Sequence, residues 1–303
     1  MHMFKMFEKL VILVILSKRE GLMQSLKGLV LFFLVFFAVA PGAAWGGNAA
    51  NFVLYNHHTA GKGEREIMLM NDFGQDFDGT RYAAQMVEFE LGITDRWTTE
   101  FMIEGQTTSG EGGYNFTGWR WENRYRLFEY GTPLNPGLYV EWEDLSDDTK
   151  YLMEVSGRTD AEEQEKARPR ERILETRLIL GQDVTERLDV AFNWINESDF
   201  DTGVTAFGYA LGLNYKLTKR PNKVRHIEEE HGYHPEIRLG MELFGGLGDS
   251  DKGITANSDV TPHYLGVNFL YHITQKMMVK FGGAIGLTNV SQDLFRLSVG
   301  YEL

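Results

Sequence analysis

The chain has 303 residues, of which 43% are hydrophobic and 13% aromatic, and its formal net charge is −13. An acidic surface of this size argues against nucleic acid as a partner, because the phosphates would be repelled. The absence of cysteine excludes disulfides, thiolate metal sites, a cysteine nucleophile and a lipidated N-terminal cysteine.

Residues 1–44 have the pattern of a secretory signal peptide region. A cationic stretch at 23–27 precedes an apolar run at 28–40, and small residues follow up to Ala44, where we expect cleavage. Residues 1–22 form a second apolar stretch, which we interpret as an over-long start with Met23 as the true initiator. An inner-membrane anchor is the alternative, although charges at 18–20 keep both runs shorter than the roughly 20 residues of a spanning helix.

Residues 45–64 are expected to form an N-terminal periplasmic segment, and from residue 65 to 303 the dominant sequence period is two. Apolar side chains alternate there with polar or small ones, which predicts strands with two different faces. Each is about long enough to cross a membrane at a tilt. Twelve strands are expected, near residues 65–73, 81–92, 96–107, 115–130, 137–145, 172–182, 187–198, 205–217, 234–246, 261–273, 277–287 and 293–303.

The composition of the two faces indicates which one points inward. One face is wide, apolar and aromatic on nearly every strand, whereas the other mixes charged residues with small ones such as Gly208 and Gly212. Large apolar residues suit lipid, while small and charged residues suit the curved, wet interior of a barrel. Together with the signal peptide, this predicts an all-β fold, a closed antiparallel transmembrane β-barrel of about 12 strands in the Gram-negative outer membrane.

Four turns share one pattern of an apolar residue, Thr, a polar residue and a base. They lie at 93–97, 184–188, 217–220 and 273–277, and with twelve strands all four fall on the periplasmic side. The longer polar loops, including the charged loop 146–171, then fall on the outer side. The final strand ends on Leu303 and resembles the closing-strand signal of such barrels. The expected partners are therefore outer-membrane lipid and the barrel-assembly machinery.

Two short stretches carry a family resemblance. The Thr-Asp-Arg-Trp turn at 94–97 and the stretch Trp-Glu-Asn-Arg-Tyr at 121–125 resemble uncharacterised transporter-like barrels near the phenol-degradation MetA-pathway outer-membrane family. The resemblance covers about residues 65–303. It implies an outer-membrane location and passage of small hydrophobic or organic compounds, and it supplies no site residues.

The candidate site is the charged face of the predicted lumen. Charges inside a narrow barrel must pair or stay hydrated, because unpaired burial is costly. Arg120, Arg124 and Arg126 are expected between the acids of the third and fifth strands. The lumen charge network, to which Glu66 also contributes an inward acid, is predicted to contain Glu88, Glu90, Glu100, Glu104, Arg120, Glu122, Arg124, Arg126, Glu141, Glu143, Glu175, Arg177, Arg238, Glu242, Lys280 and Arg296.

Histidines provide weak metal candidates. His226, His231 and His234 lie with three Glu residues inside nine residues of chain, and imidazole with carboxylate can bind zinc or copper. A solvated charged turn is the alternative. The pair His57 and His58 is a weaker candidate still. The sequence predicts no cofactor.

Three functions are compatible with this sequence. The first is a narrow channel or uptake protein for small polar or organic solutes, and the second is a structural or ligand-binding barrel with a lumen plugged by the Glu/Arg network. The third is an outer-membrane lipid-acting enzyme, which would need a Ser–His pair held by a third group. His263, His272, Ser291 and Ser298 are available, but none lies in a Gly-x-Ser-x-Gly motif. We therefore expect a protein that is not an enzyme.

Overall fold

The computed structural model describes residues 50–75, 79–110, 112–146, 149, 170–218 and 236–303. The predicted signal peptide and the candidates His226, His231 and His234 lie outside these ranges. Within them, no helix is long and apolar enough to cross a membrane.

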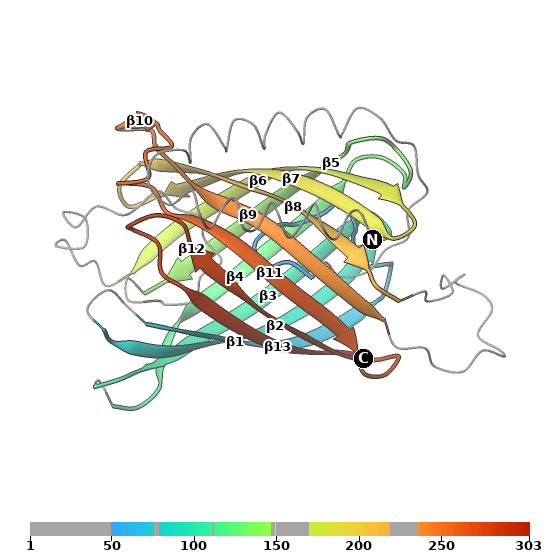
Figure 1. Cartoon of the computed structure of the whole chain (residues 1–303), viewed down its shortest axis with the longest axis horizontal. Coiled ribbons are helices and arrows are strands. Elements are labelled where there is room, and N and C mark those ends of the chain that lie inside the picture. The colour runs from blue at the N-terminus through green and yellow to red at the C-terminus, as the bar shows by residue number, and fades with distance from the viewer. Residues whose placement is uncertain (1–49, 76–78, 111, 147–148, 150–169, 219–235) are drawn as a thin grey trace. The chain divides into compact units, whose positions relative to one another are not determined.

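The described fold is built from strands alone (Figure 1). Twelve long strands form one wall, and a two-residue strand, β10, lies in the loop that follows β9. The strands are β1 (Arg65–Gln75), β2 (Arg81–Thr94), β3 (Trp97–Thr108), β4 (Asn115–Arg126), β5 (Asn135–Leu145), β6 (Glu171–Thr185), β7 (Leu188–Asp199), β8 (Thr205–Lys216), β9 (Ile237–Asp249), β10 (Gly253–Ile254), β11 (His263–His272), β12 (Met277–Gly286) and β13 (Leu294–Glu302).

The wall closes on itself. Each long strand pairs in antiparallel fashion with the long strands before and after it in the chain, and β8 pairs with β9. The last strand then pairs with the first, in a register that runs from Glu66 opposite Glu302 to Gly74 opposite Leu294. The predicted closed antiparallel barrel of twelve strands is therefore confirmed. The short strand β10 was not predicted.

The repeated Thr turns have a common hydrogen bond. The hydroxyls of Thr94, Thr185 and Thr274 each accept a hydrogen bond from the backbone N–H two residues later, at 3.2 Å in all three turns. The hydroxyl of Thr218 accepts one from the backbone N–H of Ile237 at 2.9 Å, which links the chain after β8 to the start of β9. A short side chain that satisfies a backbone donor favours a tight turn, and this explains the sequence pattern.

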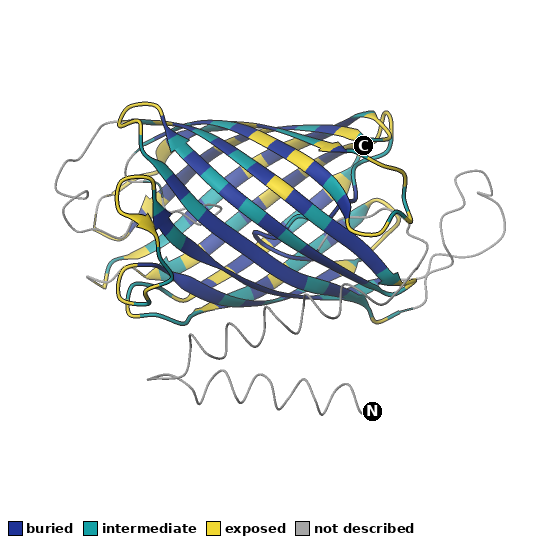
Figure 2. Ribbon diagram, turned by 90° about the horizontal axis from the view of Figure 1, so that it is seen from above, coloured by how far each residue is buried: buried dark blue, intermediate teal, exposed yellow. Residues whose placement is uncertain are grey.

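Buried and exposed residues alternate along the strands, as Figure 2 shows. On β3 and β4, Phe101 and Trp121 are about half exposed, at 48% and 52%, while their neighbours Glu100 and Arg120 are buried. The predicted direction of the two faces is therefore confirmed. We call the outward apolar surface the apolar belt; it includes Ile67, Leu69, Val87, Phe89, Phe101, Ile103, Trp121, Val140, Leu178, Phe281, Ile285, Phe295 and Leu297.

The interior also contains residues from before the first strand. Residues 50–60, which we call the lumenal segment, lie inside the barrel, and their trace is visible in blue behind the strands in Figure 1. Phe52, Val53 and Leu54 are buried in one cluster with apolar residues of β7, β8, β9, β11, β12 and β13. Ala50 belongs to a second cluster with inward methionines of β1, β2, β3 and β12. This position within the barrel is not indicated by the sequence pattern of residues 45–64, which was expected to be a periplasmic segment.

Candidate functional site

The predicted lumen charges lie on the inward face of the wall. All of them are buried except Arg124 and Lys280, which are partly buried. The alternation of strand side chains puts them there, because every second residue of a strand points to the same face. The chemistry of the interior therefore depends on how these charges are paired.

Arg120 on β4 lies between acids of both neighbouring strands. Its Nε lies 3.1 Å from Glu104 Oε2 on β3, and its Nη1 lies 3.0 Å from Glu143 Oε2 on β5. None of the three side chains is exposed to solvent. Thr149 adds a hydrogen bond to Glu104 at 2.6 Å. This group is a fully desolvated charge cluster that spans three strands.

A second cluster surrounds Arg124. Its guanidinium forms ion pairs with Glu90 on β2, at 2.8 Å, with Glu100 on β3, and with Glu122 on its own strand, at 2.6 Å. Three carboxylates thus share one base, so this side of the lumen has an excess of acid. Lys280 on β12 lies close enough to Glu88 on β2 for attraction between their opposite charges.

The remaining arginines have different partners. Arg177 pairs with Glu175 on the same strand, and Arg296 on β13 pairs with Asp72 on β1 at 2.5 and 2.6 Å. Asp72 was not among the predicted residues, although it shares the inward parity of Glu66.

Two further arginines lie near the ends of strands. Arg238 pairs with Glu236 at the start of β9. Arg126 was expected between acids, but its guanidinium donates to the backbone carbonyls of Phe128 and Asp95 and stacks on the ring of Tyr130. Arg126 therefore fastens the end of β4 to neighbouring turns.

Glu242 on β9 is held by backbone amides of the lumenal segment. Its Oε1 accepts from the N–H of Phe52 at 2.6 Å, and its Oε2 accepts from those of Val53 and Leu54 at 3.0 and 2.9 Å. The side-chain amide of Asn268 also donates to Oε1, at 2.9 Å. Consecutive N–H groups that converge on one oxyanion form a favourable anion site. Glu242 is therefore the anchor of the lumenal segment.

Further polar contacts tie the lumenal segment to the wall. Asn214 accepts from the N–H of Ala50 at 2.9 Å. Asn193 both accepts from the N–H of Tyr55 and donates to its carbonyl, each at 2.8 Å. The Tyr55 hydroxyl donates to Glu122 at 2.8 Å and so reaches the acid-rich wall. The segment thus satisfies its backbone through side chains of several strands.

A glycine provides the space for this approach. A Cβ atom at Gly240 on β9 would lie 2.3 Å from Asn51 Oδ1 and 3.0 Å from Ala50 Cβ. The lumenal segment passes so close to the wall there that any larger residue would force the Asn51 side chain to move. The small inward residues of the sequence therefore accommodate a second layer of chain.

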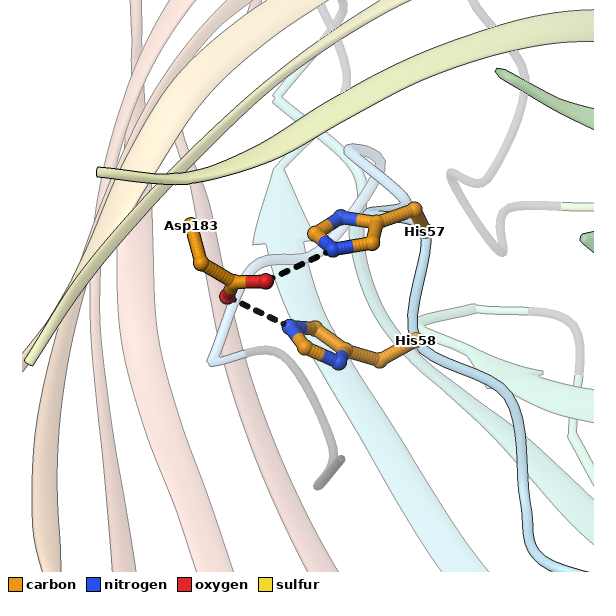
Figure 3. A group of neighbouring side chains, drawn as sticks. All are labelled: His57, His58 and Asp183. Carbon is orange, nitrogen blue, oxygen red and sulfur yellow. Dashed lines mark hydrogen bonds and ion pairs between the residues drawn. The ribbon is translucent and has the colours of Figure 1, made fainter. Parts of the chain in front are cut away.

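Two histidines of the lumenal segment meet one acid of the wall (Figure 3). His57 Nε2 lies 2.8 Å from Asp183 Oδ2, and His58 Nε2 lies 3.0 Å from Asp183 Oδ1. All three side chains are buried. Burial lowers the pKa of His58, so its imidazole is neutral at pH 7. These are the His57 and His58 that the sequence offered only as a weak candidate.

The candidates for a Ser–His pair are arranged differently. The ring of His263 contacts the hydroxyls of Tyr209 and Thr261 at 3.2 and 3.1 Å. The Ser291 hydroxyl accepts from the backbone N–H of His263 and donates to its carbonyl. These contacts fix the loop after β12 to the start of β11. They are not those of a nucleophile activated by a ring nitrogen.

Sequence reasoning included Glu242 and Glu122 but missed other residues that hold the lumenal segment. Asn193, Asn214 and Asp183 are inward on their strands, and that parity is a signal that could have placed them in the lumen. Nothing in residues 50–60 has a strand period or a recognisable motif. Much of the segment is held through backbone amides, which every sequence has.

We expect Arg120→Met to destabilise the barrel by about 3–5 kcal/mol, because it leaves Glu104 and Glu143 buried without their shared base. Denaturant unfolding of the refolded barrel, followed by tryptophan fluorescence, measures the change. Arg172→Met is the matched control, since Arg172 pairs with Asp201 at an exposed position and its loss should change the free energy of unfolding far less. Equal effects of the two substitutions would contradict a buried charge cluster.

The comparisons with known proteins concern architecture. No family model matches the chain. No curated protein matches it either. An outer membrane channel from Pseudomonas putida F1 is similar, with 14% identity and a TM-score of 0.46 over 82% of this chain and 98% of that one. The NanC porin has 10% identity and a TM-score of 0.42, over 79% and 100%. LpxR from Salmonella typhimurium has 10% identity and a TM-score of 0.37, over 78% and 99%.

Proposed function

We propose that the chain is an outer-membrane channel for small solutes, and that the structure is its closed state. One observation carries this proposal. The barrel interior is filled by the lumenal segment, which is not part of any strand of the wall and is attached to the wall by hydrogen bonds. A filling of this kind can leave the lumen while the twelve strands stay paired.

The apolar belt supports the membrane location. Soluble monomers rarely expose apolar patches larger than a few hundred square ångströms, yet here bulky apolar side chains are exposed on most strands of the wall. An apolar exterior with a polar interior is the arrangement of barrels that span an outer membrane. Outer-membrane lipid and the barrel-assembly machinery are then the proposed partners.

The charged residues and the methionine cluster of the lumen indicate the class of solute that would fit it. Strands β2 to β6 carry most of the ion-paired carboxylates and arginines, and the inward residues Met68, Met70, Met86, Met102 and Met278 of β1, β2, β3 and β12 form one apolar cluster in the same interior. Methionine side chains adapt to different apolar shapes. Such a lumen suits small organic solutes that also carry a polar group. The excess of acid around Arg124 favours cations over anions.

The first test is single-channel conductance in a planar bilayer under a KCl gradient. The wild-type barrel should give small or brief cation-preferring currents. Glu242→Gln should raise the open fraction several-fold, because removal of the charge weakens the hydrogen bonds from the amides of residues 52–54. Deletion of residues 51–58 should raise it further.

Glu186→Gln is the matched control, since Glu186 lies exposed in the turn between β6 and β7. It should leave the currents unchanged. A folded wild-type barrel, Glu242→Gln variant and deletion variant that all remain silent would contradict the channel. They would favour the structural or ligand-binding barrel with a permanently filled lumen.

A second prediction tests the membrane location. Phe101 lies in the apolar belt, and Phe101→Arg should cost about 2–4 kcal/mol in a lipid bilayer and impair assembly. Refolding yield into lipid vesicles and the unfolding midpoint measure the effect. Phe101→Leu is the control and should assemble normally. If Phe101→Arg assembles as well as Phe101→Leu, this surface does not face lipid.

A further inference from the structure

The cluster of His57, His58 and Asp183 joins two distant parts of the chain. Both histidines belong to the lumenal segment, and Asp183 lies near the end of β6, about 125 positions later. Adjacent residues of an extended chain point to opposite sides. Here both rings turn to the same carboxylate, with ring centroids 4.3 Å apart (Figure 3).

The two imidazoles have few other polar contacts. The Nδ1 atoms of both rings are buried and have no hydrogen-bond partner within the part of the chain that the structure describes. A stable fold rarely leaves such atoms without a partner. The ring of Tyr130 stacks on His58 at 5.5 Å and holds it in place. Each imidazole therefore directs its polar interaction at Asp183.

The glycine beside this cluster keeps the space open. A Cβ atom at Gly181 would lie 2.3 Å from His57 Nδ1 and 2.7 Å from its backbone nitrogen. Gly181 precedes Asp183 on the same inward face of β6. The wall is therefore shaped to admit the histidine pair at this level.

A second acid lies directly across the β-ladder. Asp183 on β6 is opposite Asp189 on β7, and both are buried. Like charges directly opposite one another in a sheet are unfavourable. Asn56 and Asn214 donate to Asp189, and Lys216 lies close enough to act on both acids. A cation between the histidines and Asp183 would offset this repulsion further.

From this geometry we infer that His57, His58 and Asp183 form a binding site for a divalent transition-metal ion, with Zn²⁺ as the best fit. Two imidazole nitrogens and a carboxylate are a common zinc donor set, and a water takes the fourth position. The donor atoms lie within 4.8 Å of one another. Ligands about 2.0–2.1 Å from a tetrahedral zinc are separated by roughly 3.3 Å, so the present distances of 2.8 and 3.0 Å need to open only slightly.

A bound ion would cross-link the lumenal segment to β6. The site does not depend on the channel proposal, because metal binding is measured without passage of any solute. Zn²⁺ binding can therefore be absent while the predicted currents are observed, or the reverse.

The test uses the full-length chain, expressed without a polyhistidine tag, extracted from membranes in detergent and stripped with EDTA. Because His226, His231 and His234 are alternative ligands, the parent protein carries H226N, H231N and H234N. Titration with Zn²⁺ against a fluorescent chelator should show one tight site per chain. Asp183→Asn, or His57→Asn combined with His58→Asn, should weaken binding by at least about tenfold.

His272→Asn is the matched control, since His272 lies at the end of β11 outside the cluster. It should leave the zinc affinity of the parent unchanged. The heat-modifiable electrophoretic mobility of each variant reports whether the barrel is folded. If the site variants do not fold, Co²⁺ substitution in the parent serves instead, and visible bands of a tetrahedral site with nitrogen and oxygen ligands are expected.

Two outcomes would overturn the inference. One is a parent protein that binds no Zn²⁺ at about 100 micromolar, a concentration roughly a hundredfold above a dissociation constant of about 1 micromolar. The other is a zinc affinity that stays the same after both Asp183→Asn and the double histidine substitution.

Discussion

The structure depends on the neutralisation of charge inside a closed barrel. A wall of twelve strands encloses an interior wider than that of about eight strands, which side chains alone can fill, and the carboxylates and guanidinium groups there are almost fully removed from water. Burial of a charge is tolerated only where the partner is close and well oriented. Arg120 meets this requirement by lying between Glu104 and Glu143 of the two adjacent strands. The position of the charged residues on the wall is therefore tied to the register of the strands.

Glu242 satisfies the same constraint without a base at ion-pair distance. Three consecutive N–H groups of the lumenal segment and the Asn268 amide surround its carboxylate. The lumenal segment needs partners as well, since a buried backbone polar group without a hydrogen bond is costly. Glu242 of the wall and the backbone N–H groups of the lumenal segment thus satisfy each other's need for a hydrogen-bond partner. An interior that holds only the side chains of the strands would leave Glu242 without the three backbone donors of the lumenal segment.

The strands of the wall were predictable from the sequence, whereas the position of the lumenal segment inside the barrel was not. A period of two fixes which residues face inward, and the Thr turns set the strand count, so the charges of β2 to β6 could be named in advance. Arg126 was predicted to lie between acids, which was wrong because its partners are backbone carbonyls of neighbouring turns. The position of residues 51–55 was not predicted for the same reason, since hydrogen bonds from backbone amides cannot be inferred from residue types. Asp183 was overlooked because its partners, His57 and His58, come from that segment.

The lumenal segment is attached by weaker bonds than those that hold the wall. Arg120 and its two acids form ion pairs with no exposure to water, and their separation would leave bare charges in the interior. Glu242 instead accepts hydrogen bonds from backbone amides, and Asp183 contacts two imidazole rings. A hydrogen bond to a charged group contributes about 1.5–3 kcal/mol, whereas removal of one partner of a buried ion pair costs about 3–5 kcal/mol. In the proposed channel, entry of water would release the segment before it disturbs the barrel, and release would require both residues 52–54 and residues 57–58 to leave the wall.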